Sequence, residues 1–245
     1  MPKIYISPAV HEHDRKCVYS PNCSENTHAN LFVFVLAKYL TACGIEYKQH
    51  GTADKGEEGM KRAVRESNAY QPDIHYVVHT NAFDGTVKGS RPQVYTGSKK
   101  GREYAEKILQ YRKQIYPYPC NIYERADLYE LSQTNAPCVY EELVFHDNAD
   151  DCKWFHENMR KMAEYTCRAF CDIFGIPFVD PFALKQGDVN GDGTVDAVDA
   201  LLAMQSSVGL AGLTADQKKR ADMDGDGTVD SVDALDILNQ STGKR

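Results

Sequence analysis

One sequence pattern occurs twice near the C-terminus, over residues 187–202 and again over residues 221–236. Each copy contains the segment Gly-Asp-Gly-Thr-Val-Asp, followed shortly by Val-Asp-Ala-Leu. A fixed internal repeat indicates that one small structural unit is built twice. We therefore expect a duplicated loop-helix unit in this part of the chain, with short helices over residues 197–206 and 231–239.

The repeated loops carry oxygen atoms at the spacing that Ca²⁺ requires. In each copy the side chains at loop positions 1, 3, 5, 9 and 12 are Asp or Asn, and a glycine at position 6 permits a sharp turn. The threonine at position 7 would contribute its backbone carbonyl. Without a cation, the carboxylates of one loop would repel one another. The sequence thus predicts two Ca²⁺ ions, with ligands Asp188, Asn190, Asp192, Thr194, Asp196 and Asp199 in the first loop and Asp222, Asp224, Asp226, Thr228, Asp230 and Asp233 in the second.

Composition separates this tail from the rest of the chain. The formal net charge is −7, and six of these charges belong to residues 186–245, which contain 11 Asp and five Lys or Arg. All eight Cys, all eight His and every aromatic residue precede residue 186. We therefore predict a domain over residues 1–180, a short linker over 181–186 and a second domain over 187–245. No apolar run is long enough to span a membrane, and we expect no nucleic-acid partner.

The tail departs from an ordinary EF-hand, because position 12 is Asp rather than Glu and no amphipathic helix precedes the first loop. This duplicated loop-helix pattern resembles the type I dockerin. The resemblance implies a small all-α calcium-binding module that docks on a cohesin module of a scaffold protein, in a cellulosome-type assembly. It also implies that loop positions 10 and 11 read the partner. These positions are occupied by Ala197, Val198, Ser231 and Val232.

The first 180 residues alternate between apolar, β-branched runs and segments with helical periodicity. Such alternation predicts an α/β fold with a mostly parallel, twisted sheet flanked by helices on both faces. The expected strands are 3–10, 45–50, 73–79, 93–96 and 137–145, and the expected helices are 25–43, 56–70, 99–112 and 149–174.

Polar residues gather where the predicted strands end. His11 and His13 follow the first strand, His79 and Asn81 end the third, and Glu141 and Glu142 lie in the last. In a parallel sheet the ligand site lies outside the carboxyl ends of the strands. A set of His, Glu and His ligands leaves the fourth position of a catalytic zinc for water, and a carboxylate that does not bind the metal can take the proton of that water.

Three sequence blocks stand out in this part of the chain: Ile-Tyr-Ile-Ser-Pro from residue 4, Val-Val-His-Thr-Asn-Ala-Phe from 77, and Pro-Cys-Val-Tyr-Glu-Glu-Leu-Val-Phe from 137. With these blocks, residues 3–176 look like the zinc-dependent N-acetylmuramoyl-L-alanine amidases of the Amidase_3 type. The resemblance implies one catalytic Zn²⁺ held by His11, Glu25 and His79, with Glu142 as the general base and then the general acid. Asn81 would either bind substrate or hold its loop. The implied substrate is peptidoglycan, cut between muramic acid and L-alanine.

The first block departs from the family pattern. The family has Asp-Pro-Gly-His-Gly-Gly, whereas this chain has Ser-Pro-Ala-Val-His-Glu-His over residues 7–13. His11 is therefore the favoured first ligand, with His13 and His28 as alternatives. Glu141 should point to the opposite face of its strand from Glu142. Two other functions compete: hydrolysis of a different amide, and an inactive module that only binds the cell wall.

The eight cysteines suit an oxidising exterior, and the implied dockerin points to an extracellular or cell-surface location. Cys17 and Cys23 flank a short loop and could pair, with free buried thiols as the alternative. The absence of a Cys-x-x-Cys motif argues against a structural zinc ribbon. Met1 leads into the first strand without a charged-then-apolar segment, so we expect a mature domain without a signal peptide.

Overall fold

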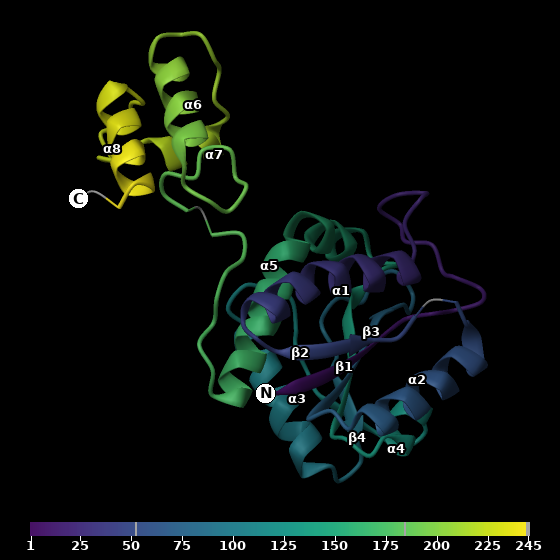
Figure 1. Ribbon diagram of the computed structural model, residues 1–245. Helices are drawn as coiled ribbons and strands as arrows, with labels where there is room; N and C mark the ends of the chain where they lie inside the picture. Colours follow the sequence, from purple (N-terminus) through teal and green to yellow (C-terminus); the bar gives the residue numbers. More distant parts are fainter. Residues whose placement is uncertain (52, 184, 244–245) are drawn as a thin grey trace. The chain divides into compact units, whose positions relative to one another are not determined.

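The computed structural model describes residues 1–51, 53–183 and 185–243 (Figure 1). One residue of the predicted linker 181–186 and the last two residues of the predicted dockerin 187–245 lie outside these ranges. The chain divides into two compact units, residues 1–181 and residues 182–245. Within the described residues, no helix is long and apolar enough to cross a membrane.

The first unit is built on one six-stranded sheet with the strand order β2-β1-β3-β6-β4-β5 (Figure 1). All neighbouring strands run parallel except β4 and β6, which are antiparallel. The prediction of a mostly parallel sheet flanked by helices is confirmed, whereas the short strand β5 was not predicted. The strands are β1 (Lys3–Pro8), β2 (Glu46–Gln49), β3 (Ile74–Asn81), β4 (Gln93–Tyr95), β5 (Tyr123–Arg125) and β6 (Cys138–Phe145).

Helices cover the sheet in two groups. In the first group α5 packs against both α1 and α3, and in the second α2 packs against α4. The helix α4, a single short segment, was not predicted. The helices of this unit are α1 (Glu25–Ala42), α2 (Gly56–Tyr70), α3 (Lys99–Arg112), α4 (Tyr129–Gln133) and α5 (Ala149–Phe174).

Local sequence signals explain where the two longest helices begin and end. The hydroxyl of Ser24 accepts a hydrogen bond from the backbone N–H of Thr27 and caps α1. The side chain of Asn148 caps α5 in the same way, through the N–H of Asp151. Gly175 ends α5 with φ +66°, a left-handed conformation that glycine adopts without steric cost. The cap from Ser24 thus fixes the start of α1, where Glu25 is the first residue.

The second unit contains α6 (Ala197–Ser207), α7 (Ala215–Ala221) and α8 (Ser231–Ser241). The helices α6 and α8 pack against each other, as expected of two equivalent loop-helix units. The helix α7 was not predicted, although Thr214 and Gln217 form a reciprocal capping box at its start. A small apolar core holds the unit together and consists of Val189, Ala200, Ala203, Ala221, Ala234 and Ile237.

Candidate active site and calcium loops

A pocket of about 460 Å³ opens at the carboxyl ends of β1, β3 and β6. Its walls include His11 after β1, Glu25 at the start of α1, His79 on β3 and Glu142 on β6. In the parallel register His79 lies opposite Glu142, so the two side chains share one face of the sheet. Four residues that are distant in sequence therefore meet where a parallel sheet places its ligand site.

Three of these residues present their ligand atoms to one another. His11 Nε2 lies 3.3 Å from His79 Nδ1 and 3.2 Å from Glu25 Oε2. His79 Nδ1 lies 2.9 Å from Glu25 Oε1. Two nitrogens and an oxygen bound to one tetrahedral Zn²⁺ at about 2.0–2.2 Å would lie about 3.3–3.6 Å apart, close to the two longer of these distances. The spacing and the donor types therefore fit a zinc ion with one open position.

The electrostatics of this group also suit a cation. Burial alone would raise the pKa of Glu25, but hydrogen bonds from His11 and His79 outweigh burial and hold that pKa well below its usual range. The carboxyl of Glu25 is thus an anion in a buried position. The ring of Tyr140 stacks on His79 with centroids 4.7 Å apart, which fixes the orientation of the imidazole.

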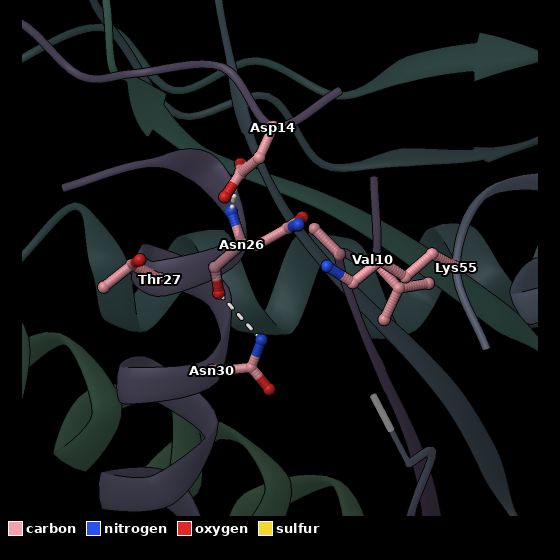
Figure 2. A pocket seen from close by; sticks show the side chains of 7 residues that line it. Val10, Asp14, Asn26, Thr27, Asn30 and Lys55 are labelled. Atoms are coloured by element: carbon pink, nitrogen blue, oxygen red, sulfur yellow. Dashed lines mark hydrogen bonds between the residues drawn. The ribbon is translucent and has the colours of Figure 1, made fainter. Parts of the chain in front are cut away.

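Asn26, which the sequence did not single out, positions His11. Its side-chain oxygen accepts a hydrogen bond from the backbone N–H of His11 at 2.9 Å, and its Nδ2 donates to the carbonyl of His11 at 3.0 Å. The backbone N–H of Asn26 in turn donates to Asp14. Figure 2 shows Asn26 in a neighbouring pocket of about 500 Å³, between Asp14 and Asn30. The residue following Glu25 therefore clamps the loop that carries the first histidine.

Glu142 has the properties of a proton acceptor. Its Oε2 is buried and has no hydrogen-bond partner among the described residues. Burial is the largest cause that raises the pKa of Glu142 well above its usual range, and the nearby carboxylates of Glu25 and Glu141 raise it further. An unpartnered buried carboxyl oxygen costs free energy, which identifies this residue as a functional candidate rather than a structural one.

The adjacent Glu141 has a different environment. Its side chain is fully buried and forms an ion pair with Arg112, with 2.6 Å between Arg112 Nη1 and Glu141 Oε1. The hydroxyl of Tyr76 donates to its second oxygen at 3.1 Å. Alternation along β6 therefore directs Glu141 into the core and Glu142 into the pocket, as the sequence predicted for the two faces.

The alternative zinc ligands lie elsewhere. His13 lines the pocket but is exposed and lies outside the group of His11, Glu25 and His79, and His28 belongs to a separate cluster described below.

Two further residues line the pocket. The side-chain oxygen of Asn81 accepts a hydrogen bond from the N–H of Ala82, an arrangement that holds the turn after β3. His146, for which no sequence motif indicated a role, also lines the pocket, and its Nδ1 lies 2.9 Å from the hydroxyl of Thr80.

The two acidic loops of the C-terminal unit have the same internal geometry. Asp188 accepts hydrogen bonds from the N–H groups of Gly191 and Gly193 at 2.8 and 3.0 Å, and Asp222 accepts the equivalent pair at the same distances. Asp199 and Asp233, at position 12, are buried carboxylates that cap α6 and α8 reciprocally with their N-cap residues. Asp222, Asp224 and Asp233 hold oxygens within 4.8 Å of one another. The second loop thus brings together carboxylate oxygens, the ligands that Ca²⁺ prefers.

The residues predicted to contact a cohesin begin these two helices. Ala197 and Val198 open α6, and Ser231 and Val232 open α8. Both valines are half exposed, with 51% of their surface accessible, although apolar side chains of this kind usually pack inside. The two equivalent positions therefore present equivalent apolar surfaces.

Comparisons with known proteins agree with this architecture. A family model described as N-acetylmuramoyl-L-alanine amidase matches residues 4–171, and a model described as dockerin type I domain matches residues 186–240. No curated protein sequence matches the chain significantly.

Several solved structures share the fold of the first unit. The catalytic domain of CwlV, an N-acetylmuramoyl-L-alanine amidase from Bacillus (Paenibacillus) polymyxa var. colistinus, superposes with a TM-score of 0.63 at 14% identity, covering 72% of this chain and 100% of that one. The CwlD amidase from Clostridioides difficile gives 0.62 at 15% identity, covering 71% and 99%. The amidase AmiC2 of Nostoc punctiforme gives 0.60 at 18% identity, covering 71% and 97%. This chain thus belongs to the N-acetylmuramoyl-L-alanine amidase family and carries a type I dockerin domain at its C-terminal side.

Proposed function

We propose that this protein is a zinc-dependent hydrolase of the amide between N-acetylmuramic acid and L-alanine in peptidoglycan. Family membership supplies the activity and the substrate class. The observation that carries the proposal is the convergence of His11, Glu25 and His79 beside the unpartnered carboxyl of Glu142. An amidase needs both a place for a Lewis acid and a nearby base for water, and this pocket offers both.

In this proposal His11 Nε2, His79 Nδ1 and a carboxylate oxygen of Glu25 would hold the metal. A Zn²⁺ ion bound there would supply Lewis-acid chemistry to the scissile carbonyl and to the attacking water. Glu142 accepts the proton of that water and returns it to the departing amine of L-alanine. Burial raises the pKa of Glu142, and this makes its carboxylate a stronger proton acceptor than an exposed carboxylate would be. The substrate-binding role of Asn81 stays a prediction.

We further propose that the dockerin binds two Ca²⁺ ions and docks on a cohesin module through Ala197, Val198, Ser231 and Val232. The repeated carboxylate geometry of the two loops supports the calcium sites, and the exposed valines at equivalent positions support the docking surface. A cohesin partner and a cell-wall substrate are both met outside the cytoplasm, so we propose secretion to a cellulosome-type assembly at or beyond the cell surface.

The test is amide hydrolysis by the full chain and by Glu142→Gln. Loss of the base should lower kcat by about 10²–10⁴-fold while zinc binding is kept, because Glu142 is not a ligand in this proposal. The matched control is Glu103→Gln, an exposed carboxylate on α3 that should leave the rate unchanged. New L-alanine amino termini from purified cell walls would establish the bond that is cut.

Two results would favour the competing functions. Hydrolysis of other peptide amides without release of L-alanine termini would assign a different substrate. The second result is that zinc-loaded protein binds cell walls, while wild type and Glu142→Gln show equal and negligible turnover. This result would indicate an inactive binding module.

A further inference from the structure

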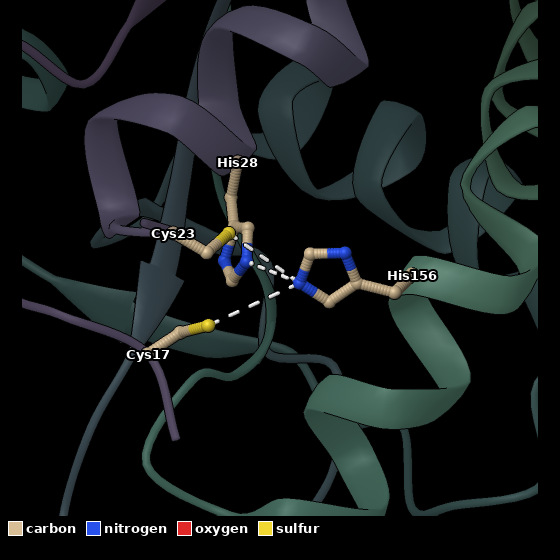
Figure 3. Close-up of side chains that lie close together, drawn as sticks. All are labelled: Cys17, Cys23, His28 and His156. Carbon is tan, nitrogen blue, oxygen red and sulfur yellow. Dashed lines mark hydrogen bonds between the residues drawn. The ribbon is translucent and has the colours of Figure 1, made fainter. Parts of the chain in front are cut away.

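A second cluster of metal-ligating side chains lies outside the amidase pocket (Figure 3). Cys17 and Cys23 come from the loop between β1 and α1, His28 comes from α1, and His156 comes from α5. Figure 3 shows the four side chains pointing toward one another, and their ligand atoms all lie within 4.8 Å of one another. Cys17, Cys23 and His28 are buried, and His156 is half buried.

The distances match a tetrahedral Cys₂His₂ zinc site. With Zn–S of about 2.3 Å and Zn–N of about 2.0–2.1 Å, tetrahedral geometry places two nitrogens about 3.3 Å apart and a nitrogen and a sulfur about 3.6 Å apart. His28 Nε2 lies 3.0 Å from His156 Nε2. His156 Nε2 lies 3.4 Å from Cys23 Sγ and 3.9 Å from Cys17 Sγ.

As a purely structural cluster, these side chains satisfy one another poorly. Thiols are weak hydrogen-bond donors and acceptors. The other ring nitrogen of His28, Nδ1, is buried and has no hydrogen-bond partner among the described residues. Burying two thiols and two imidazole nitrogens with so few strong hydrogen bonds costs free energy, and a cation bound to these four ligand atoms would offset their share of that cost.

The chemistry of the four ligands favours such a cation. A thiol that binds zinc loses its proton, and a neutral imidazole is a common zinc ligand. Two thiolates would neutralise the charge of Zn²⁺ inside the protein.

The backbone around the two cysteines presents both sulfurs to the same point. The N–H of Cys17 donates to the carbonyl of Cys23 at 3.0 Å, and the N–H of Cys23 donates to the carbonyl of Ser20 at 3.1 Å. An isolated antiparallel bridge joins Lys16 to Ser24. The loop therefore closes on itself as a short turn, and all eight cysteines of the protein are free thiols.

We propose that Cys17, Cys23, His28 and His156 bind a structural Zn²⁺ that is separate from the metal of the amidase pocket. Four protein ligands complete the tetrahedron, so this ion keeps no open position for water or substrate. It fastens the loop between β1 and α1 to α1 and α5. That loop carries His11 and leads directly into Glu25, so the ion stabilises the segment on which the amidase pocket is built.

The spacing explains why sequence patterns miss this site. Cys17 and Cys23 are separated by five residues rather than two, and His156 lies 128 residues beyond His28. The expectation that no zinc ribbon is present is compatible with this site, because three separate parts of the fold contribute its ligands.

The test uses the full chain, purified under reducing conditions, depleted of metal and then loaded with Co²⁺. Cobalt bound by thiolates gives an intense sulfur-to-metal charge-transfer absorption, whereas cobalt held by His11, Glu25 and His79 gives none because that set contains no sulfur. We expect this absorption in wild type and in Cys120→Ser, a buried cysteine outside the cluster. It should be lost in Cys23→Ser, and in His156→Gln it should change in intensity and position.

Zinc content gives a second measure that does not depend on a variant folding. Wild-type protein loaded with zinc should retain two ions per chain, and a thiol-blocking mercurial should release one of them. Absence of charge-transfer absorption in folded, reduced wild-type protein would overturn the proposal. A Cys17–Cys23 disulfide in protein purified without reductant, found by non-reducing peptide mapping, would overturn it as well.

Discussion

The buried ion pair between Arg112 and Glu141 offers a sharp test of how the sheet of the amidase unit is stabilised. Both side chains are almost fully buried, and Arg112 also donates to the hydroxyls of Ser90 at 2.6 Å and Thr166 at 3.1 Å. The variant Arg112→Met keeps the length and apolar volume of the side chain but removes its charge. Glu141 then loses its cation while its carboxyl stays in the core.

The expected cost follows from what remains around Glu141. Removing one partner of a buried pair typically costs about 3–5 kcal/mol, since the other charge is left uncompensated. Tyr76 and Ser90 still lie within hydrogen-bond reach of the Glu141 carboxyl at 3.1 and 3.3 Å, which favours the lower end. We therefore expect a loss of about 3 kcal/mol in the free energy of unfolding, and a fall of about 6–12 °C in Tm.

Urea unfolding followed by tryptophan fluorescence measures this loss of stability in the amidase unit specifically. The chain has one tryptophan, Trp154 on α5, which packs against Tyr116 with ring centroids 4.7 Å apart. The signal therefore reports the amidase unit and is insensitive to the dockerin. The midpoint should fall while the denaturant slope stays constant.

The double variant Arg112→Met with Glu141→Gln supplies the control. It leaves no charge at these two buried positions, so it should be more stable than Arg112→Met alone. The reasoning would be refuted by an Arg112→Met protein within about 0.5 kcal/mol of wild type, or by a double variant that loses the full sum of the two single losses.

Three further perturbations test other parts of the structure. Removing calcium with a chelator, or replacing Asp199 and Asp233 with Ala, should lower the far-ultraviolet helix signal of the dockerin, and an unchanged spectrum would count against the calcium loops. Metal-free protein should lose stability as pH falls below about 6.5. Burial lowers the pKa of His28 to about 3 and also lowers that of His50, so below pH 6.5 the unfolded state binds more protons than the folded state. A free energy of unfolding in urea that stays constant between pH 7 and 5 would contradict this. Asn26→Ala should reduce kcat by about 10-fold or more with zinc still bound, since misplacing a ligand-bearing loop weakens catalysis without removing a ligand, whereas full activity would exclude the clamp on His11.

The strongest local patterns predicted the fold well. Hydrophobic periodicity located α2, α3 and α5 to the residue, because each has a long amphipathic face. The short elements β5, α4 and α7 were missed, since segments of three to seven residues carry little periodicity, although the equally short β4 was predicted. Their positions depend on packing against neighbours rather than on local sequence.

The residues of the candidate site also differ in how well the sequence predicts them. The sequence singles out His79 and Glu142 because polar side chains are unusual in long buried strands, and their roles stay predictions. The clamp from Asn26 and the cluster around His28 were not, because they depend on a loop without regular structure and on partners far away in the chain. His28 lies about one helical turn after Glu25, and nothing in the sequence indicates which of the two clusters it joins.

Diffraction at the zinc absorption edge tests the central claim most directly. In crystals of zinc-loaded protein, we predict an anomalous peak about 2.0–2.2 Å from His11 Nε2, His79 Nδ1 and a carboxylate oxygen of Glu25, with Glu142 nearby but not bound. Absence of a peak among these three residues would contradict the proposed catalytic metal. A peak bound by His13 in place of His11 would contradict the assignment of the first ligand.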